Sequence, residues 1–233
     1  MQARRTPRPE PRVPLSRERV LRAAVALADE AGIEALTMRE LGLRLGVEAM
    51  SLYNHVANKD DVLDGMVDLV VGEIDLPSDA VDWKEAMRRR AISAQAVFSR
   101  HPWASALIDS RESSGVERLR YFEWVIGTLR RAGFSAELAA RAFSVLDSYI
   151  YGFGRQRSHM SAGSEAEPED MAEAFLRAIP ADEYPYLREL VVEHAMASGY
   201  DDGADLEFGL DLILDGLQRL LVTPPSRDRS GGS

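Results

Sequence analysis

The sequence predicts an all-α protein with a small N-terminal helical domain and a larger C-terminal helical domain. Apolar residues recur at three- and four-residue steps along the chain, and no segment alternates apolar and polar residues as a strand does. Glycine and proline interrupt this pattern at helix-length intervals. With 233 residues, of which 45% are hydrophobic, the chain can bury a substantial core.

The first predicted helix begins after Ser16 and ends at Gly32. A serine hydroxyl accepts a backbone N–H at a helix start, and glycine adopts the conformation that ends many helices. Between them, apolar residues repeat at core spacing: Val20, Leu21, Ala24, Leu27, Ala28 and Ala31.

Two short helices joined by a tight turn come next. Thr37 and Glu40 have capping-box spacing, and Gly46 can take the left-handed conformation of the turn. We expect the second short helix to carry Ser51, Tyr53, Asn54 and His55. A further helix is predicted from near Asn58, which is a good N-cap. This order of elements is a helix-turn-helix, and its second helix displays polar groups where DNA contacts are made.

The stretch from Leu15 to Asp64 resembles the DNA-binding domain of the TetR (tetracycline repressor) family. The motifs follow one another at family spacing: Ala31-Gly-Ile33, Leu36-Thr-Met-Arg39, Leu45-Gly-Val47, Ser51-Leu-Tyr-Asn-His-Val56, Asn58-Lys59 and Val62-Leu-Asp64. Beyond residue 64 the chain is similar to the family in length, helical pattern and acidity. The resemblance implies a transcriptional regulator whose second domain binds a ligand and forms a dimer.

We therefore expect a disordered basic arm at residues 1–14, a helix-turn-helix domain at 15–62, a ligand-binding and dimerisation domain at 63–222, and a disordered tail at 223–233. Residues 1–60 hold 10 Lys+Arg and 8 Asp+Glu of the chain's 28 and 38. The acidic excess thus belongs to the second domain, which phosphate should repel. An acidic surface that only keeps the protein soluble is the alternative.

Ten residues of the first domain are predicted to contact DNA: Thr37, Met38, Arg39, Ala49, Met50, Ser51, Tyr53, Asn54, His55 and Lys59. The Asn54 amide can pair bidentately with adenine, and Ala49 and Met50 can contact a thymine methyl group. Four of the ten suit phosphate contacts: Arg39, Tyr53, His55 and Lys59. For any single residue, a packing or capping role is an equal alternative. Many tetracycline repressors carry an aromatic residue where this chain has Asn54, so we expect a different operator.

The second domain should contain helices near residues 83–98, 103–108, 119–129, 171–179 and 186–197. It also contains a long helix from Ser135 to about residue 158 and a last helix from Asp205. Gly152 and Gly154 lie inside the long helix, where each glycine costs about 1 kcal/mol, which suggests close approach of another backbone. The last helix is apolar on more than one side.

By the resemblance, the long helix and the last helix form a four-helix bundle with their copies across a two-fold axis. Such a dimer would place two DNA-reading domains about 34–36 Å apart on a palindrome. The alternative is that both helices are interior elements of a monomer.

The resemblance also implies a cavity in each second domain, whose filling moves the helix after Asn58 and spreads the two DNA-binding domains. The residues expected near it are Met66, Val70, Met87, Trp103, Phe122, Leu146, Tyr149 and Phe153, with plain core packing as the alternative for each. Tetracycline-binding positions fall near Asp75, Arg90 and Ile108, and none matches. We therefore expect a hydrophobic or aromatic small molecule and no chelated metal.

Enzyme signals are weak. The chain has no cysteine, its four histidines are far apart, and it has no Gly-x-Ser-x-Gly nucleophile motif. We predict no catalytic residues, no cofactor and no metal. The N-terminal segment lacks the apolar core of a signal peptide, and no run approaches the roughly 18 apolar residues of a membrane helix. We thus expect a cytoplasmic protein with no membrane partner.

The sequence as a whole predicts a dimeric, sequence-specific DNA-binding regulator, acting as a repressor that a small molecule releases from a palindromic operator. A regulator whose ligand enhances DNA binding, or which needs no ligand, is one alternative. A helical small-molecule-binding protein or enzyme with a vestigial helix-turn-helix is the other.

Overall fold

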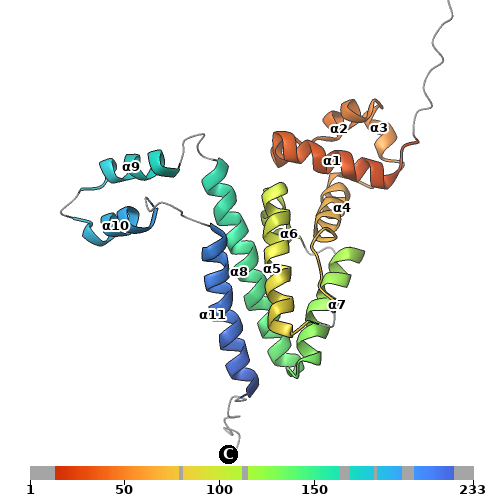
Figure 1. Ribbon diagram of the computed structural model, residues 1–233. Coiled ribbons are helices and arrows are strands. Elements are labelled where there is room, and N and C mark those ends of the chain that lie inside the picture. The colour runs from red at the N-terminus through yellow and green to blue at the C-terminus, as the bar shows by residue number, and fades with distance from the viewer. Residues whose placement is uncertain are drawn as a thin grey trace, which may run out of the picture. The chain divides into compact units, whose positions relative to one another are not determined.

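The computed structural model describes residues 14–78, 81–111, 115–162, 168–180, 183–195 and 202–222 (Figure 1). Every regular element in these ranges is a helix, which confirms the predicted all-α fold. The chain divides into two compact units, Met1–Leu69 and Val70–Ser233, with the boundary inside helix α4 (Lys59–Val71). The boundary predicted between residues 62 and 63 lies in the same helix. The predicted arm, except Pro14, and the predicted tail lie outside the described residues.

The first unit contains α1 (Arg17–Ala31), the 3-10 turn η1 (Ile33–Ala35), α2 (Met38–Leu45), α3 (Ala49–Leu52) and most of α4. The predicted caps are confirmed. Ser16 Oγ accepts the N–H of Arg19 at 3.2 Å, and Thr37 Oγ1 accepts the N–H of Glu40 at 3.1 Å. The core of the unit is formed by buried aliphatic side chains: Val20, Leu21, Ala24, Leu36, Leu41, Leu52 and Val62.

Two glycines set the tight junction between α2 and α3. Gly46 ends α2 with φ 68° and ψ 34°, the left-handed conformation that the sequence predicts. Gly42 faces the turn, and a Cβ at this position would lie 3.0 Å from the carbonyl oxygen of Val47 and 3.1 Å from the nitrogen of Ala49. The two helices therefore approach closely because residue 42 has no side chain.

Helix α3 is shorter than the sequence suggests. Only Ala49–Leu52 is helical, and Tyr53, Asn54 and His55 lie in the turn that follows, so the expected extent of this helix is wrong. The His55 N–H donates to the Leu52 carbonyl at 2.9 Å. Serine and asparagine favour turns over helix interiors, and the chain must also bend to enter the Asn58 cap of α4. In that cap, Asn58 Oδ1 accepts the N–H of Asp61 at 2.8 Å.

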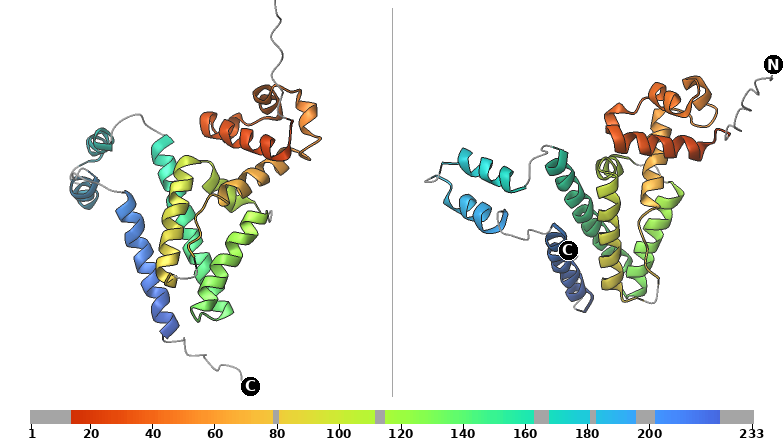
Figure 2. Two further views of the ribbon diagram at one scale, coloured as in Figure 1. Left: turned by 45° about the vertical axis from the view of Figure 1, so that its right-hand side comes forward. Right: turned by 45° about the horizontal axis from the view of Figure 1, so that its top comes forward.

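The second unit is organised around α8 (Ala136–Ala162), which is longer than predicted. It packs against α5 (Trp83–Arg100), α6 (Ala104–Ser110), α7 (Val116–Arg131) and α11 (Asp202–Val222), as Figures 1 and 2 show. Ser135, the residue from which this helix was predicted to run, caps it, because its Oγ accepts the Leu138 N–H at 3.1 Å. The buried side chains of the unit include Trp83, Met87, Phe98, Leu129, Leu146, Ile150 and Leu214.

The segment between α8 and α11 contains α9 (Pro168–Ala178), α10 (Pro185–Leu190) and the π-helical turn η2 (Val191–Ala195). The helix predicted at 186–197 is thus divided into an α-helical and a π-helical part, and its last two residues lie outside the described ranges. η2 contacts both α9 and α10. Helix α11 begins at Asp202, earlier than the predicted Asp205.

Within the single chain, the two glycines of α8 do not lie against another backbone, and a close approach across a dimer interface stays a prediction. A Cβ at Gly154 would lie 3.1 Å from Cδ2 of Phe98, so the close neighbour is a ring on α5. A Cβ at Gly152 would have open space around it. Gly154 therefore accommodates core packing, and Gly152 borders a cavity.

Candidate functional site

The ten predicted DNA contacts all lie at the surface of the first unit. Met50 is 73% exposed and Tyr53 is 44% exposed. Thr37, Arg39, Asn54 and Lys59 are also exposed, whereas Met38, Ala49, Ser51 and His55 are half-buried. The structure thus brings Met50, Ser51, Tyr53, Asn54 and His55 together on α3 and the turn after it. Their availability for DNA contact stays a prediction.

Two of the predicted contacts also have local structural roles. The Thr37 hydroxyl accepts the cap hydrogen bond of α2, but its own proton remains available to a phosphate. Lys59 is the first residue of α4, where the helix dipole is positive and backbone N–H groups lack intrahelical partners. Both positions combine a fixed backbone with a group that suits a phosphate.

Asp61 ties the start of α4 to α1 through a feature that the sequence analysis missed. Its two carboxylate oxygens accept from Nη1 and Nη2 of Arg17 at 2.8 and 2.6 Å. The same carboxylate accepts the backbone N–H of Ala57 at 2.8 Å. The hydrogen bond from Arg17 is the main cause that lowers the pKa of Asp61. The pairing therefore fixes the turn after α3 to α1, and no local spacing signals it, because Arg17 and Asp61 are 44 residues apart in the sequence.

A second bidentate pair holds α2 to α1. Arg44 Nη1 and Nη2 donate to the two carboxylate oxygens of Glu30 at 2.6 and 2.5 Å. The hydrogen bond from Arg44 lowers the pKa of Glu30. Helix α2, before the exposed turn, and helix α4, after it, are thus both anchored to α1 by arginine–carboxylate pairs, whose planar geometry fixes orientation.

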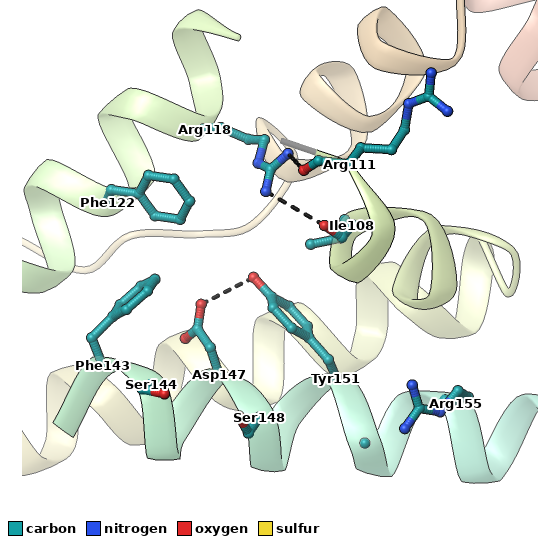
Figure 3. Close-up of a pocket in the computed structure, with 11 residues that line it drawn as sticks. Ile108, Arg111, Arg118, Phe122, Phe143, Ser144, Asp147, Ser148, Tyr151 and Arg155 are labelled. Carbon is teal, nitrogen blue, oxygen red and sulfur yellow. Dashed lines mark hydrogen bonds between the residues drawn. The ribbon is translucent and has the colours of Figure 1, made fainter. Parts of the chain in front are cut away.

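The second unit has a cavity of about 360 Å³ between α6, α7 and α8 (Figure 3). It is lined by aromatic, arginine and small polar residues: Ile108, Arg111, Arg118, Phe122, Phe143, Ser144, Asp147, Ser148, Tyr151, Gly152 and Arg155. Seven of these lie on α8 at steps of three and four residues, so one face of that helix forms the floor.

A buried polar network lies beside this cavity. Arg90 Nη1 donates to Asp147 Oδ1 and to the Tyr121 hydroxyl, both at 2.8 Å. The Tyr121 and Tyr151 hydroxyls donate to Asp147 at 3.1 and 3.0 Å. Burial raises the pKa of both tyrosines, so they stay protonated as donors. Among the described residues, Arg90 Nε and Nη2 are buried without a hydrogen-bond partner.

Of the eight residues predicted near a ligand, Phe122 alone lines this cavity. Met66, Val70, Met87 and Leu146 are completely buried, and Trp103 is nearly so. Tyr149 donates through its hydroxyl to the carbonyl oxygens of Asp205 and Leu206 on α11, and Phe153 packs near its ring. The structure therefore does not gather the eight residues around this cavity.

The sequence analysis missed the polar side of this cavity. Arg118, Asp147, Tyr151 and Arg155 line it but were not among the expected residues. The signal that would have found three of them is the run Phe143, Asp147, Tyr151 and Arg155, which repeats every fourth residue along one helix face. Charged groups in a periodic row with aromatic ones are unusual for a plain core face.

Helices α8 and α11 carry large apolar side chains at the surface of the second unit. Val145 of α8 is 49% exposed, and Phe208 and Leu212 of α11 are 69% and 59% exposed. The two helices pack side by side. This exposed apolar surface of the single chain is the "α8–α11 face" below.

In the described ranges, we find no helix with both the length and the apolar character needed to cross a lipid bilayer. Within those same ranges, histidine, aspartate and glutamate side chains do not gather in groups of three or more that would hold a metal ion.

Comparison with known proteins covers both units. Residues 20–66 match the family model described as "Bacterial regulatory proteins, tetR family". Residues 76–221 match the model "Tetracyclin repressor-like, C-terminal domain". The chain is 33% identical over 228 residues to the HTH-type transcriptional repressor DrrR1 of Streptomyces coeruleorubidus, covering 94% of this chain and 83% of the relative.

Two solved structures are similar throughout. A possible TetR family transcriptional regulator from Streptomyces coelicolor A3(2) has a TM-score of 0.75 and 31% identity, covering 88% of this chain and 100% of that chain. ActR from Streptomyces coelicolor, in complex with actinorhodin, has a TM-score of 0.74 and 27% identity, covering 89% and 98%. The relatives are transcriptional regulators rather than enzymes. With both units matched in order, the chain belongs to the TetR family of DNA-binding transcriptional regulators.

Proposed function

We propose that the protein is a dimeric repressor that binds a palindromic operator and is released from it by a small-molecule effector. The observation that carries this proposal is the exposure of Met50, Tyr53 and Asn54 on α3 and the turn after it, a segment whose flanking helices α2 and α4 are anchored to α1 by bidentate ion pairs. This segment must be held rigidly, because the readout of bases depends on the accurate placement of a few side chains in a DNA groove. The name of the Streptomyces coeruleorubidus relative favours repression over activation.

The α8–α11 face supports the dimer. Three large apolar side chains on adjacent helices are exposed in the single chain, at 49% to 69% of their surface. In a two-fold symmetric dimer, this face would pack against the same face of the second copy. Its exposed apolar side chains would then be removed from water, because an isologous interface uses the same surface on both subunits. Two DNA-binding units related by such an axis read the two halves of a palindrome.

The cavity between α6, α7 and α8 supports an effector. Its volume of about 360 Å³ suits a small organic molecule, and ligand sites in general are concave with a few placed polar groups. ActR, which has a similar fold, holds actinorhodin in its crystal structure. An effector that prefers one conformation of the dimer shifts the population between operator-bound and free states by its differential affinity. Because the operator to which the protein would bind is part of chromosomal DNA, the protein would act in the cytoplasm.

Selection of bound duplexes from a random pool tests the proposal. The purified full chain should enrich one palindromic sequence, since two identical units related by a two-fold axis contact two identical half-sites. Enrichment of a sequence without internal symmetry would reject the dimeric mode of binding, and the absence of any enriched sequence would reject sequence-specific readout.

Matched variants locate the contacts. Tyr53→Ala should weaken binding to the selected duplex, because Tyr53 is 44% exposed on the candidate surface. Tyr184→Ala is the control, since this tyrosine is similarly exposed, at 50%, but belongs to the second unit. Equal effects of the two changes would contradict the assignment of the interface to the first unit.

A further inference from the structure

We infer that the effector is a neutral aromatic molecule with a hydroxyl group, and that this hydroxyl donates to Oδ2 of Asp147 in the cavity between α6, α7 and α8. The inference rests on the proposed function, since it specifies the chemistry of the effector in that same cavity. It is carried by the hydrogen bonds of Asp147, by the ion pair of Asp147 with Arg90, and by the aromatic rings beside Asp147 on α8.

Asp147 presents an open acceptor position to the cavity. Its Oδ1 accepts from Arg90 Nη1 at 2.8 Å and from the Tyr121 hydroxyl at 3.1 Å. Among the described residues, Oδ2 accepts from the Tyr151 hydroxyl, at 3.0 Å, and from no other group. A carboxylate oxygen has two lone pairs, so it can accept two hydrogen bonds. Because Asp147 lines the cavity, a ligand donor can reach the second acceptor position of Oδ2.

The ion pair with Arg90 decides the charge of the ligand that suits this acceptor. Arg90 is completely buried and lies 2.8 Å from Asp147, so the carboxylate already has its counter-ion. A cationic ligand would lose its hydration in exchange for contact with a pair that is already neutral, which is unfavourable. A neutral hydroxyl avoids that cost, and its hydrogen bond to an ionised oxygen is of the stronger, charge-assisted kind.

Aromatic side chains lie on both sides of Asp147. Phe143 precedes it by four residues and Tyr151 follows it by four, so each lies about 6 Å from it along the axis of α8. Figure 3 shows the three side chains extending from α8 to the same side, with Asp147 between the two rings. Phe143 already contacts Phe122 edge to face, with centroids 5.3 Å apart. A ligand ring would therefore pack against this aromatic wall, rather than between its members, while its hydroxyl reaches Asp147.

The cavity has room for such a ligand beside Asp147. The lining next to it on α8 is formed by small residues, Ser144, Ser148 and Gly152. A Cβ at Gly152 would have no neighbour within 4 Å. The cavity volume of about 360 Å³ lies at the lower end of the range for small-molecule sites, which suits a molecule of two or three fused rings.

Paired probes test this inference with the full chain. β-Naphthol and its methyl ether share one fluorescent ring system and are both uncharged at neutral pH, but only β-naphthol has a hydroxyl donor. We expect β-naphthol to bind at least about tenfold more tightly than the ether, because a hydrogen bond to a charged group is a strong one and the ether cannot donate it. Fluorescence titration gives the two dissociation constants.

Tyr151→Phe makes the test sharper, because it keeps the ring and removes the hydroxyl that shares Oδ2. The preference for β-naphthol should then increase by at least about threefold, since the carboxylate oxygen has lost its other donor. Arg90→Met combined with Asp147→Leu removes the acceptor together with its counter-ion, and should abolish the preference. Tyr186→Phe is the matched control. It removes the hydroxyl of a tyrosine on α10 that is 84% exposed, and should leave the preference unchanged.

Equal binding of the two probes by the wild type, or binding of neither, would overturn the inference. So would a preference in Tyr151→Phe that does not exceed that of the wild type, or a preference that survives in the folded double variant. Binding of the wild type to its selected duplex, measured on the same preparation, separates the two proposals. Duplex binding without probe discrimination rejects the effector class alone, and the absence of both rejects the proposed function.

Discussion

Arg90 of α5 and Asp147 of α8 form an ion pair of 2.8 Å in which both side chains are buried. Asp147 is also a lining residue of the cavity, and its second carboxylate oxygen accepts from Tyr151, another lining residue. One carboxylate thus connects the core of the second unit with the candidate ligand site. A ligand that displaces the Tyr151 hydroxyl would change the hydrogen bonding of the pair that joins α5 to α8.

Removing one member of this pair should destabilise the second unit strongly. Asp147→Ala leaves the Arg90 charge buried without its counter-ion, so the free energy of unfolding should fall by about 3–5 kcal/mol. Urea unfolding followed by circular dichroism measures the change. The double variant Arg90→Met with Asp147→Leu should lose less, since neither charge then remains buried. A double variant that is as unstable as the sum of its single changes would contradict this account.

The Arg17–Asp61 pair should make stability depend on pH in the acidic range. The hydrogen bond from Arg17 lowers the pKa of Asp61 in the folded state. The ionised carboxylate therefore stabilises the fold above the unfolded-state pKa of about 4, and this stabilisation is lost as the pH falls through the folded-state pKa. Asp61→Asn should therefore be less stable than the wild type at neutral pH, and the gap should close in acid. Unfolding in urea from about pH 7 to about pH 3 tests this.

The control for that experiment is Glu34→Gln, which removes an exposed carboxylate from η1 of the same unit. It should leave the pH dependence close to that of the wild type. If the difference between the wild type and Asp61→Asn stays constant across the whole range, the pair does not cause the effect.

Gly46 should be required for its backbone conformation. Its φ of 68° lies in the left-handed region, so Gly46→Ala should reduce the free energy of unfolding by about 1–2 kcal/mol. Gly46→Asn should be milder, because asparagine tolerates this region better than alanine does. The two variants are compared by urea unfolding. An alanine variant at least as stable as the asparagine variant would show that the turn has another conformation.

The α8–α11 face should control the oligomeric state. A charge introduced at a buried apolar interface has no partner, so Phe208→Glu combined with Leu212→Glu should convert dimers into monomers. Light scattering at several concentrations gives the mass. Val116→Glu is the control, because Val116 is 75% exposed but lies at the start of α7. Dimers that persist in the double variant would place the interface elsewhere.

Local signals predicted the fold well because helix ends depend on neighbouring residues. The hydroxyls of Ser16, Thr37 and Ser135 cap helices as their spacing indicates, and Gly46 is left-handed as expected. The extent of α3 was overestimated, because apolar spacing at Leu52 and Val56 continues through a turn that is not helical.

The cavity was harder to predict because it depends on tertiary geometry. The residues that line it come from three helices. How each helix is rotated about its own axis decides which residues face the cavity, for example Leu146 or Asp147 of α8. Leu146 is the better core residue on hydrophobicity, and it is indeed fully buried. The neighbouring Asp147 faces the cavity because Arg90, far away in the sequence, neutralises it.

The most direct test of the central claim is a titration of the selected duplex and a scrambled duplex with the wild type and with Asn54→Ala, at fixed physiological salt. The wild type should prefer the selected duplex, and Asn54→Ala should lose about 1–3 kcal/mol of that preference, which a bidentate amide–adenine pair supplies. Affinity for the scrambled duplex should stay the same, because phosphate contacts carry it. A wild type that binds both duplexes equally would contradict sequence-specific readout by this helix-turn-helix.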